Sequence, residues 1–166
     1  GELEEGLACL EKSLAICQKT GQQDIELQTL ASLAEVELAC NHVDTALNYA
    51  ETLQSEAQKI SARHYQARGM YTLGLCYQRQ AEAIKAEQMW HQALFLAHET
   101  NQQGLLWRIH ASLAEVVGVA PLAETHYRIA AEVLDQIIYP IEDEALRKSF
   151  FNAPPVKAIL DKTKEW

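Results

Sequence analysis

The chain repeats itself at intervals of about 40 residues, and this repeat constrains the fold more than any other feature. The hexapeptide Ala31–Val36 returns unchanged as Ala111–Val116, two intervals later. A looser copy, Tyr71–Cys76, lies midway in the same register. Repeats of about 20 to 50 residues are typical of solenoids, in which each unit buries its apolar face only against its neighbours. The sequence therefore predicts stacked units that share one long exposed surface.

Composition and periodicity indicate that each interval is helical. Leu, Ala, Glu and Gln, all good helix formers, dominate the chain, and no run alternates apolar and polar residues as a strand would. Between residues 3 and 17, apolar side chains recur at steps of three and four. Gly21 suits a left-handed helix end, whereas Asp24 and Ser61 are predicted to cap the helices that follow them. Two helices per interval, joined by short turns, must pack as antiparallel hairpins.

The last part of the chain departs from the repeat. Tyr139–Pro140 interrupts the pattern, and the acidic run at 142–144 suits a helix N-terminus. We expect a repeat array over residues 1–139, with a truncated first unit, and capping helices over 140–166. The predicted fold class is all-α, a right-handed superhelix of helix hairpins. The chain is expected to start on the second helix of a hairpin, with further repeats upstream.

Charge and cysteine usage exclude several classes of protein. The net charge of −9 argues against a nucleic-acid partner, which needs a basic stripe, and against an anionic membrane surface. No apolar run is long enough to span a bilayer. The four cysteines lie in apolar helical stretches and never occur as Cys-x-x-Cys, so we expect buried free thiols, a cytoplasmic protein, and neither cofactor nor metal. They are Cys9, Cys17, Cys40 and Cys76.

Two motifs in the third unit resemble the signatures of tetratricopeptide repeats (TPRs). The first comprises Met70, Leu73, Gly74 and Tyr77, and the second comprises Ala86, Trp90 and Ala93. The resemblance implies that Gly74 and Ala86 let the helices of one hairpin approach closely. It also implies that Tyr77 and Trp90 fill the gap between successive hairpins. The interval in this chain is longer than the roughly 34 residues usual for that family, and HEAT-like pairs share the longer interval.

The segment 146–160 adds a second resemblance. Its pattern of Leu, Arg, Phe and Pro is similar to the segment that closes C-terminal repeat arrays in large bacterial signalling ATPases and cyclases. This resemblance implies that the chain is the C-terminal sensing or docking arm of such a protein. No phosphate-binding loop, cyclase or kinase motif occurs within the sequence.

The TPR resemblance also implies a binding groove, because the first helix of each hairpin lines the concave face in that family. The residues carried over are Gln28, Ala31, Glu35, Leu38, Arg68, Tyr71, Leu75, Gln78, Arg108, Ala111, Glu115 and Gly118. Arg68 and Arg108 lie one interval apart, so together they could hold a carboxylate or phosphate, with Tyr71 stacking on a peptide. The alternative is that both arginines pair with Glu35 and Glu115 inside the groove.

Other candidate chemistry is sparse. His91, His98 and Glu87 could share a helix face, but a metal needs three or four converging ligands. His110 and His126 could contact each other across the fourth hairpin, and no nucleophile accompanies the carboxylates. The predicted function is therefore non-catalytic binding of a protein or peptide in the groove. The alternatives are an intramolecular regulatory arm that contacts the parent protein's catalytic domain, and self-association through apolar surface at the N-terminal end.

Overall fold

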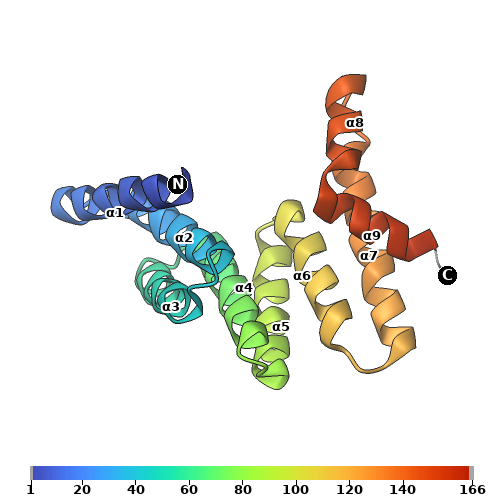
Figure 1. The fold of residues 1–166 in the computed structure, drawn as a ribbon, viewed down its shortest axis with the longest axis horizontal. Helices are drawn as coiled ribbons and strands as arrows, with labels where there is room; N and C mark the ends of the chain where they lie inside the picture. Colours follow the sequence, from blue (N-terminus) through green and yellow to red (C-terminus); the bar gives the residue numbers. More distant parts are fainter. Residues whose placement is uncertain (1, 165–166) are drawn as a thin grey trace. The chain divides into compact units, whose positions relative to one another are not determined.

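The computed structural model of the protein describes residues 2–164, all of whose regular structure is α-helical (Figure 1). The helices are α1 (Glu2–Thr20), α2 (Gln23–Ala39), α3 (Val43–Lys59), α4 (Arg63–Arg79), α5 (Ala83–Glu99), α6 (Gln103–Val116), α7 (Ala120–Ile138), α8 (Glu144–Asn152) and α9 (Pro154–Lys164). This confirms the prediction of an all-α fold built from helix hairpins. None of the described helices has the length and apolar character needed to cross a membrane.

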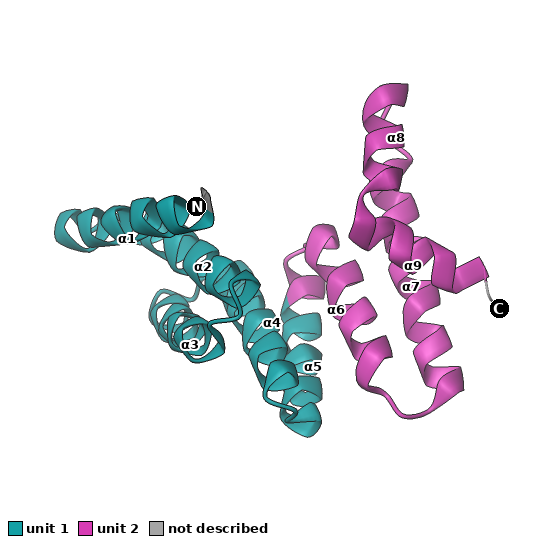
Figure 2. Ribbon diagram, in the orientation of Figure 1, with its two compact units in different colours: residues 1–96 teal, residues 97–166 magenta. Residues whose placement is uncertain are grey.

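The chain forms two compact units, residues 1–96 and 97–166 (Figure 2). In the first unit α2 packs against α1 and α3, and α4 packs against both α2 and α3. In the second unit α6 pairs with α7, and α9 packs against both α7 and α8. The helices from α1 to α4 pack mainly against their neighbours in the chain, which is the contact pattern of a repeat protein. The last helix, α9, differs because it packs mainly against α7.

A turn of one repeated geometry follows each helix from α1 to α5, and it recurs at a constant spacing of half an interval. Its central residue has a positive φ: 72° at Gly21, 64° at Asn41, 57° at Ser61, 61° at Ala81 and 51° at Asn101. The next residue donates its N–H to a carbonyl five positions earlier, as in the bonds from His42 to Glu37 (2.9 Å) and from Glu82 to Tyr77 (2.9 Å). This is the Schellman arrangement, which satisfies the last carbonyls of each helix.

These turns correct two predicted caps. Ser61 is the left-handed residue that ends α3, so it lies one position too early to cap α4, whose preceding residue is Ala62. Asp24 lies inside the first turn of α2 and makes no capping bond there, because the turn places Gln22 at the cap. The acidic run before α8 behaves as predicted, since Asp143 accepts a bond from the N–H of Leu146 (2.8 Å).

Ala81 occupies its left-handed conformation at a steric cost that glycine would avoid. We expect Ala81→Gly to raise the free energy of unfolding by about 0.5–1 kcal/mol, because relief of the left-handed strain exceeds the added chain entropy. Ala81 is exposed, so no packing is lost. Urea unfolding followed by circular dichroism measures the change. The matched control is Ala15→Gly, at an exposed position in the middle of α1, which should destabilise the protein. Equal losses from both variants would refute the argument.

The core of the first unit combines leucines with small residues. One cluster joins α2, α3 and α4 through Leu27, Leu30, Leu53 and Tyr65. A second brings together Ala34, Ala50 and Leu73, with Tyr77 packed against them. Because Ala34 and Ala50 belong to the preceding hairpin, Tyr77 lies between hairpins, as the repeat motif predicted.

Trp90 packs inside its own hairpin, α4–α5, where its fully buried indole lies against Gly74. Its predicted role between successive hairpins stays a prediction. A Cβ placed on Gly74 would come within 2.2 Å of the Trp90 Nε1 atom. The indole N–H donates to the carbonyl of Tyr71 (3.1 Å). Gly74 is therefore required for close packing within the hairpin, as the motif implied. The group that packs against Gly74 is the indole of Trp90 on α5.

Candidate functional site

The predicted groove residues of the first unit lie on α2 and α4, which pack against each other. Gln28 and Glu35 are exposed on α2, whereas Arg68, Tyr71, Leu75 and Gln78 are half-buried on α4. Ala31 and Leu38, carried over with them, are buried and contribute to the core instead. The accessible part of this surface is therefore mainly polar, with one aromatic and one aliphatic side chain.

A hydrogen-bonded network links α2 and α4 through the guanidinium of Arg68. Its Nε and one terminal nitrogen donate to Oε1 of Glu35 (3.1 and 2.7 Å), and the other terminal nitrogen donates to Oε1 of Gln28 (3.1 Å). For Arg68 the structure thus confirms the alternative interpretation, pairing within the groove. Both bonds to Glu35 use the same oxygen, which leaves Oε2 to accept a bond from a bound chain.

Tyr65 extends this network and was not predicted from the sequence. Its hydroxyl donates to the carbonyl of Asp24 (3.3 Å) and lies 3.5 Å from Oε1 of Gln28. The pKa of Tyr65 is raised, first by burial and then by the negative charge of Asp24. Its phenol therefore stays protonated and acts as a donor. No motif includes position 65, and only the packing of α4 on α2 reveals its role.

Arg108 and Glu115 are exposed on α6, in the second unit. The guanidinium of Arg108 lies 5.4 Å from the ring centroid of Trp107, a cation–π distance. Glu115 contributes, after burial, to a raised pKa of Tyr127. Ala111 is half-buried and Gly118 exposed in the same unit. Arg68 and Arg108 belong to different units, so their predicted placement on one surface stays a prediction.

Two histidines meet in the second unit as the sequence suggested. The Nδ1 atoms of His110 and His126 lie 2.9 Å apart, and both side chains are buried. One ring must donate and the other accept, so this bond requires one unprotonated Nδ1 atom. In the first unit His91 Nε2 lies 3.6 Å from Glu87. Across residues 2–164, no three His, Cys, Asp or Glu side chains converge as a metal site would require.

The prediction that all four cysteines are buried is correct for Cys17 and Cys76 but wrong for Cys9, because the face of α1 that carries Cys9 is exposed. Cys9 is exposed, Cys40 is half-buried, and Cys17 and Cys76 are buried, all as free thiols. Burial, the largest cause, raises the pKa of Cys76 to about 11. At neutral pH this thiol stays protonated and is a poor nucleophile.

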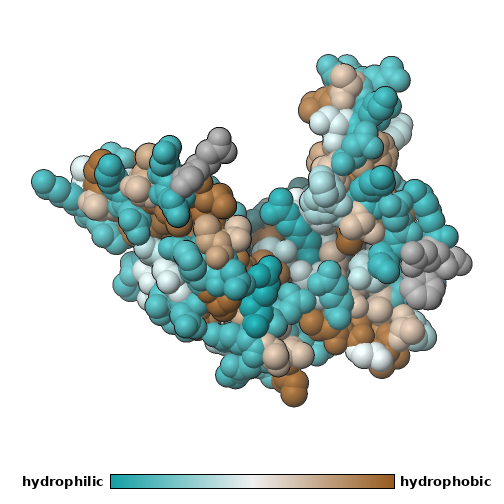
Figure 3. Space-filling view, in the orientation of Figure 1, coloured by the Kyte–Doolittle hydropathy of each residue, from teal (hydrophilic) through white to brown (hydrophobic). Residues whose placement is uncertain are grey.

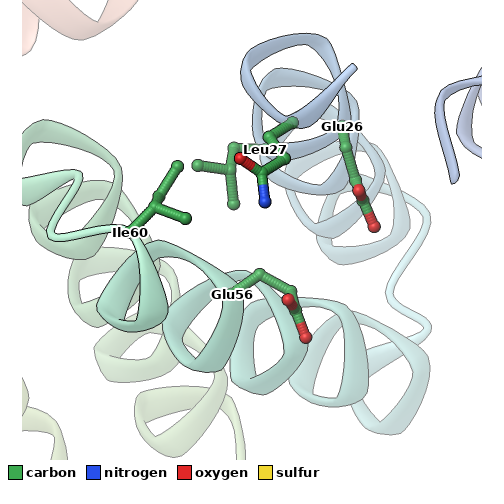
Figure 4. Close-up of a pocket in the computed structure, with 5 residues that line it drawn as sticks. Glu26, Leu27, Glu56 and Ile60 are labelled. Atoms are coloured by element: carbon green, nitrogen blue, oxygen red, sulfur yellow. The ribbon is translucent and has the colours of Figure 1, made fainter. Parts of the chain in front are cut away.

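Three hollows lie within single units. The smallest, about 20 Å³, is lined by Leu27 and Ile60 on one side and by the carboxylates of Glu26 and Glu56 on the other (Figure 4). Its volume suits a water molecule, and Lys59 already neutralises Glu56 at 2.6 Å. A second hollow of about 450 Å³ lies between α4 and α5, and Phe95, which is 64% exposed, lines it. A third, of about 510 Å³, lies between the end of α7 and α8.

Apolar side chains are also exposed on α1. Leu3 and Ile16 expose 55% and 60% of their surface, and apolar atoms lie among polar ones over α1 in Figure 3. Self-association through the N-terminal end would need such an exposed apolar surface. That self-association remains a prediction.

Comparison with known proteins supports the fold and leaves the family open. No protein-family model matches the chain, and no curated protein matches it. A solved structure described as nearly identical TPR-like repeats of a kinesin light chain from Podospora anserina superposes with a TM-score of 0.61. The match covers 99% of this chain and 87% of that one, at 17% sequence identity. The chain is therefore similar in fold to a TPR-like repeat protein.

Proposed function

We propose that this chain is a non-catalytic protein-interaction module that binds an extended segment of a partner protein along the first helices of its hairpins. The observation that supports this most is the polar network on α2 and α4. Glu35 presents Oε2 as an acceptor and Gln28 presents its amide NH2 as a donor, and Arg68 holds both side chains in place. Repeat folds of this kind present extended surfaces suited to peptides.

The proposed contacts divide between the two units. In the first unit Glu35 accepts a bond from a backbone N–H of the partner, and the amide of Gln28 donates to a backbone carbonyl. Tyr71 and Leu75 contact apolar side chains of the partner, and Gln78 supplies both donor and acceptor. Within the second unit, Arg108 and Glu115 on α6 offer a donor and an acceptor of their own. Because Arg68 is already engaged by two side chains, it positions these groups and does not by itself clamp an anion.

A charge reversal at Glu35 tests the proposal. We expect Glu35→Lys to reduce the amount of bound partner by about tenfold or more, because it removes an acceptor and repels Arg68. The measurement is a quantitative pull-down from a lysate of the source cells, with bound proteins identified by mass spectrometry. Glu51→Lys, an exposed change of equal charge on α3, is the control.

Both variants must first show the helical circular dichroism of the parent protein. Capture of the same proteins in the same amounts by the parent and by Glu35→Lys would contradict the proposal. Equal losses from Glu35→Lys and Glu51→Lys would also contradict it, because they would reflect net charge rather than the groove.

The wider setting is part of the same proposal. The tail resemblance suggests that this module belongs to a larger bacterial signalling protein, acting in the cytoplasm, without nucleic acid or membrane as its partner. The net charge of −9 supports this exclusion, because nucleic acids and inner membrane leaflets are themselves anionic.

A further inference from the structure

Two buried histidines join α6 to α7, which pack side by side in the second unit (Figure 1). His110 on α6 is 5% exposed, and His126 on α7 is 9% exposed. Their Nδ1 atoms lie 2.9 Å apart, at hydrogen-bonding distance, and their ring centroids lie 5.2 Å apart. A bond between two titratable rings thus lies inside the α6–α7 hairpin.

This bond limits how many protons the two rings can carry. A ring nitrogen that donates must bear a proton, and one that accepts must not. The bond persists when the pair is neutral or carries one added proton, because one Nδ1 atom is still unprotonated. A second added proton places an N–H on both Nδ1 atoms, breaks the bond, and leaves two positive charges side by side in a buried site.

The surroundings of the pair offer little to stabilise a second proton. At three and four residues before and after each histidine, every side chain is aliphatic except Trp107. Helix α9, which also packs against α7, buries the aliphatic side chains of Val156 and Ile159. Tyr127 on α7 stays neutral, because burial and then the charge of Glu115 raise its pKa.

The charged side chains of the three packed helices lie in water. Those within two turns of the pair on α6 and α7, and those on α9, are all exposed: Arg108, Glu115, Glu124, Arg128, Glu132, Lys157, Asp161, Lys162 and Lys164. Five of these nine groups are cations and four are carboxylates, so they supply no surplus of negative charge. Solvent screens charges in such exposed positions, and they compensate a buried charge poorly.

We propose that the His110–His126 pair is an acid-sensitive switch that holds α6 against α7 near neutral pH and releases them in mild acid. An opened hairpin exposes both imidazoles to water, where each takes up a proton near pH 6.5, the ordinary range of histidine. The open state therefore binds more protons than the closed state in acid. The closed state is stable above about pH 6.5 and loses stability as the pH falls below that value.

A histidine of the first unit responds in the opposite direction. His42 Nδ1 lies 2.7 Å from Oε2 of Glu37, whose side chain is 9% exposed. A proton on His42 adds an ion pair to this contact, so mild acid does not weaken it. Acid thus acts on the second unit, and this switch is separate from the partner binding proposed above, so either can fail without the other.

Native-state hydrogen exchange of the ¹⁵N-labelled chain measures the opening of each helix. Amide protection is compared between pH 6.5 and pH 5, after correction for the intrinsic pH dependence of exchange. We expect protection in α6 and α7 to fall about tenfold over this range, and protection in α2 and α3 to fall much less.

The variant His110→Asn separates the switch from general effects of acid. Its side-chain amide keeps a polar group near the place of Nδ1, and Oδ1 can accept a bond from a protonated His126. We expect this variant to lose most of the acid-dependent fall in α6 and α7. The matched control is His42→Asn, which removes a histidine from the first unit and should retain the whole fall.

Imidazole ¹⁵N chemical shifts of the parent protein provide a second measurement that needs no variant. While the second unit is folded, at least one of the two Nδ1 atoms should stay unprotonated. The proposal is overturned if both Nδ1 atoms are protonated in the folded unit, or if protection falls equally in α2, α3, α6 and α7. A full acid-dependent fall in folded His110→Asn, or its loss in His42→Asn, would overturn it equally.

Discussion

Replacement of Trp90 by alanine is expected to lower the free energy of unfolding of the first unit by about 3–5 kcal/mol. The indole is fully buried, and its N–H donates to the carbonyl of Tyr71. The variant loses the buried apolar surface, leaves a cavity against Gly74, and removes the donor for that carbonyl. Urea unfolding followed by circular dichroism measures the loss as a lower midpoint.

The control for this prediction lies on the same helix. Phe95 is also aromatic but is 64% exposed, so Phe95→Ala should change the free energy of unfolding by less than about 0.5 kcal/mol. Similar losses from Trp90→Ala and Phe95→Ala would show that α5 is not anchored through Trp90. A full loss of structure in Trp90→Ala can be resolved with Trp90→Phe, which keeps most of the volume but not the donor.

Gly74→Ala should destabilise the same unit by about 2–4 kcal/mol, although it adds a single methyl group and a better helix former. The added Cβ would lie 2.2 Å from Nε1 and 2.5 Å from Cδ1 of Trp90, so the indole must move. That movement breaks the bond to the Tyr71 carbonyl and displaces the neighbouring core. The same unfolding measurement applies.

Gly6→Ala is the matched control, because a Cβ on this glycine within α1 would meet nothing within 4 Å. There we expect a gain of about 0.5–1 kcal/mol from helix propensity alone. A loss at position 6 as large as at position 74 would remove the steric explanation.

A double-mutant cycle separates the Gly74–Trp90 contact from general effects. In the Trp90→Ala background the added methyl group has room, so Gly74→Ala should become nearly neutral or stabilising. The preceding hairpin already contains this combination, since Ala34 and Ala50 occupy the equivalent positions one interval earlier and pack together. Additive losses in the double variant would contradict a direct clash.

The comparison of these two hairpins shows how the repeat tolerates variation. The helices of a hairpin can be spaced by two alanines or by a glycine facing a tryptophan. The large residue on one helix requires the small one on the other, because a packed interior leaves no spare volume. The register of the repeat is therefore maintained by paired substitutions rather than by one fixed motif.

Local sequence signals predicted the helices and the turns between them. Apolar residues at steps of three and four identified the helices, and Gly21 lies in the turn where it was expected. The left-handed role of Ser61 and Ala81 could not be read from residue type, because neither residue favours that conformation. Their positions follow from the fixed length of the hairpins, which places the turns at a constant spacing.

The sequence by itself determined the helical repeat of this protein, since amphipathic periodicity and regular turns depend only on neighbouring residues. The tertiary structure alone decided which groups meet: Arg68 with Glu35 and Gln28, and Trp90 with Gly74. Side chains so far apart in sequence come together only when helices pack, and spacing along one helix does not encode that packing.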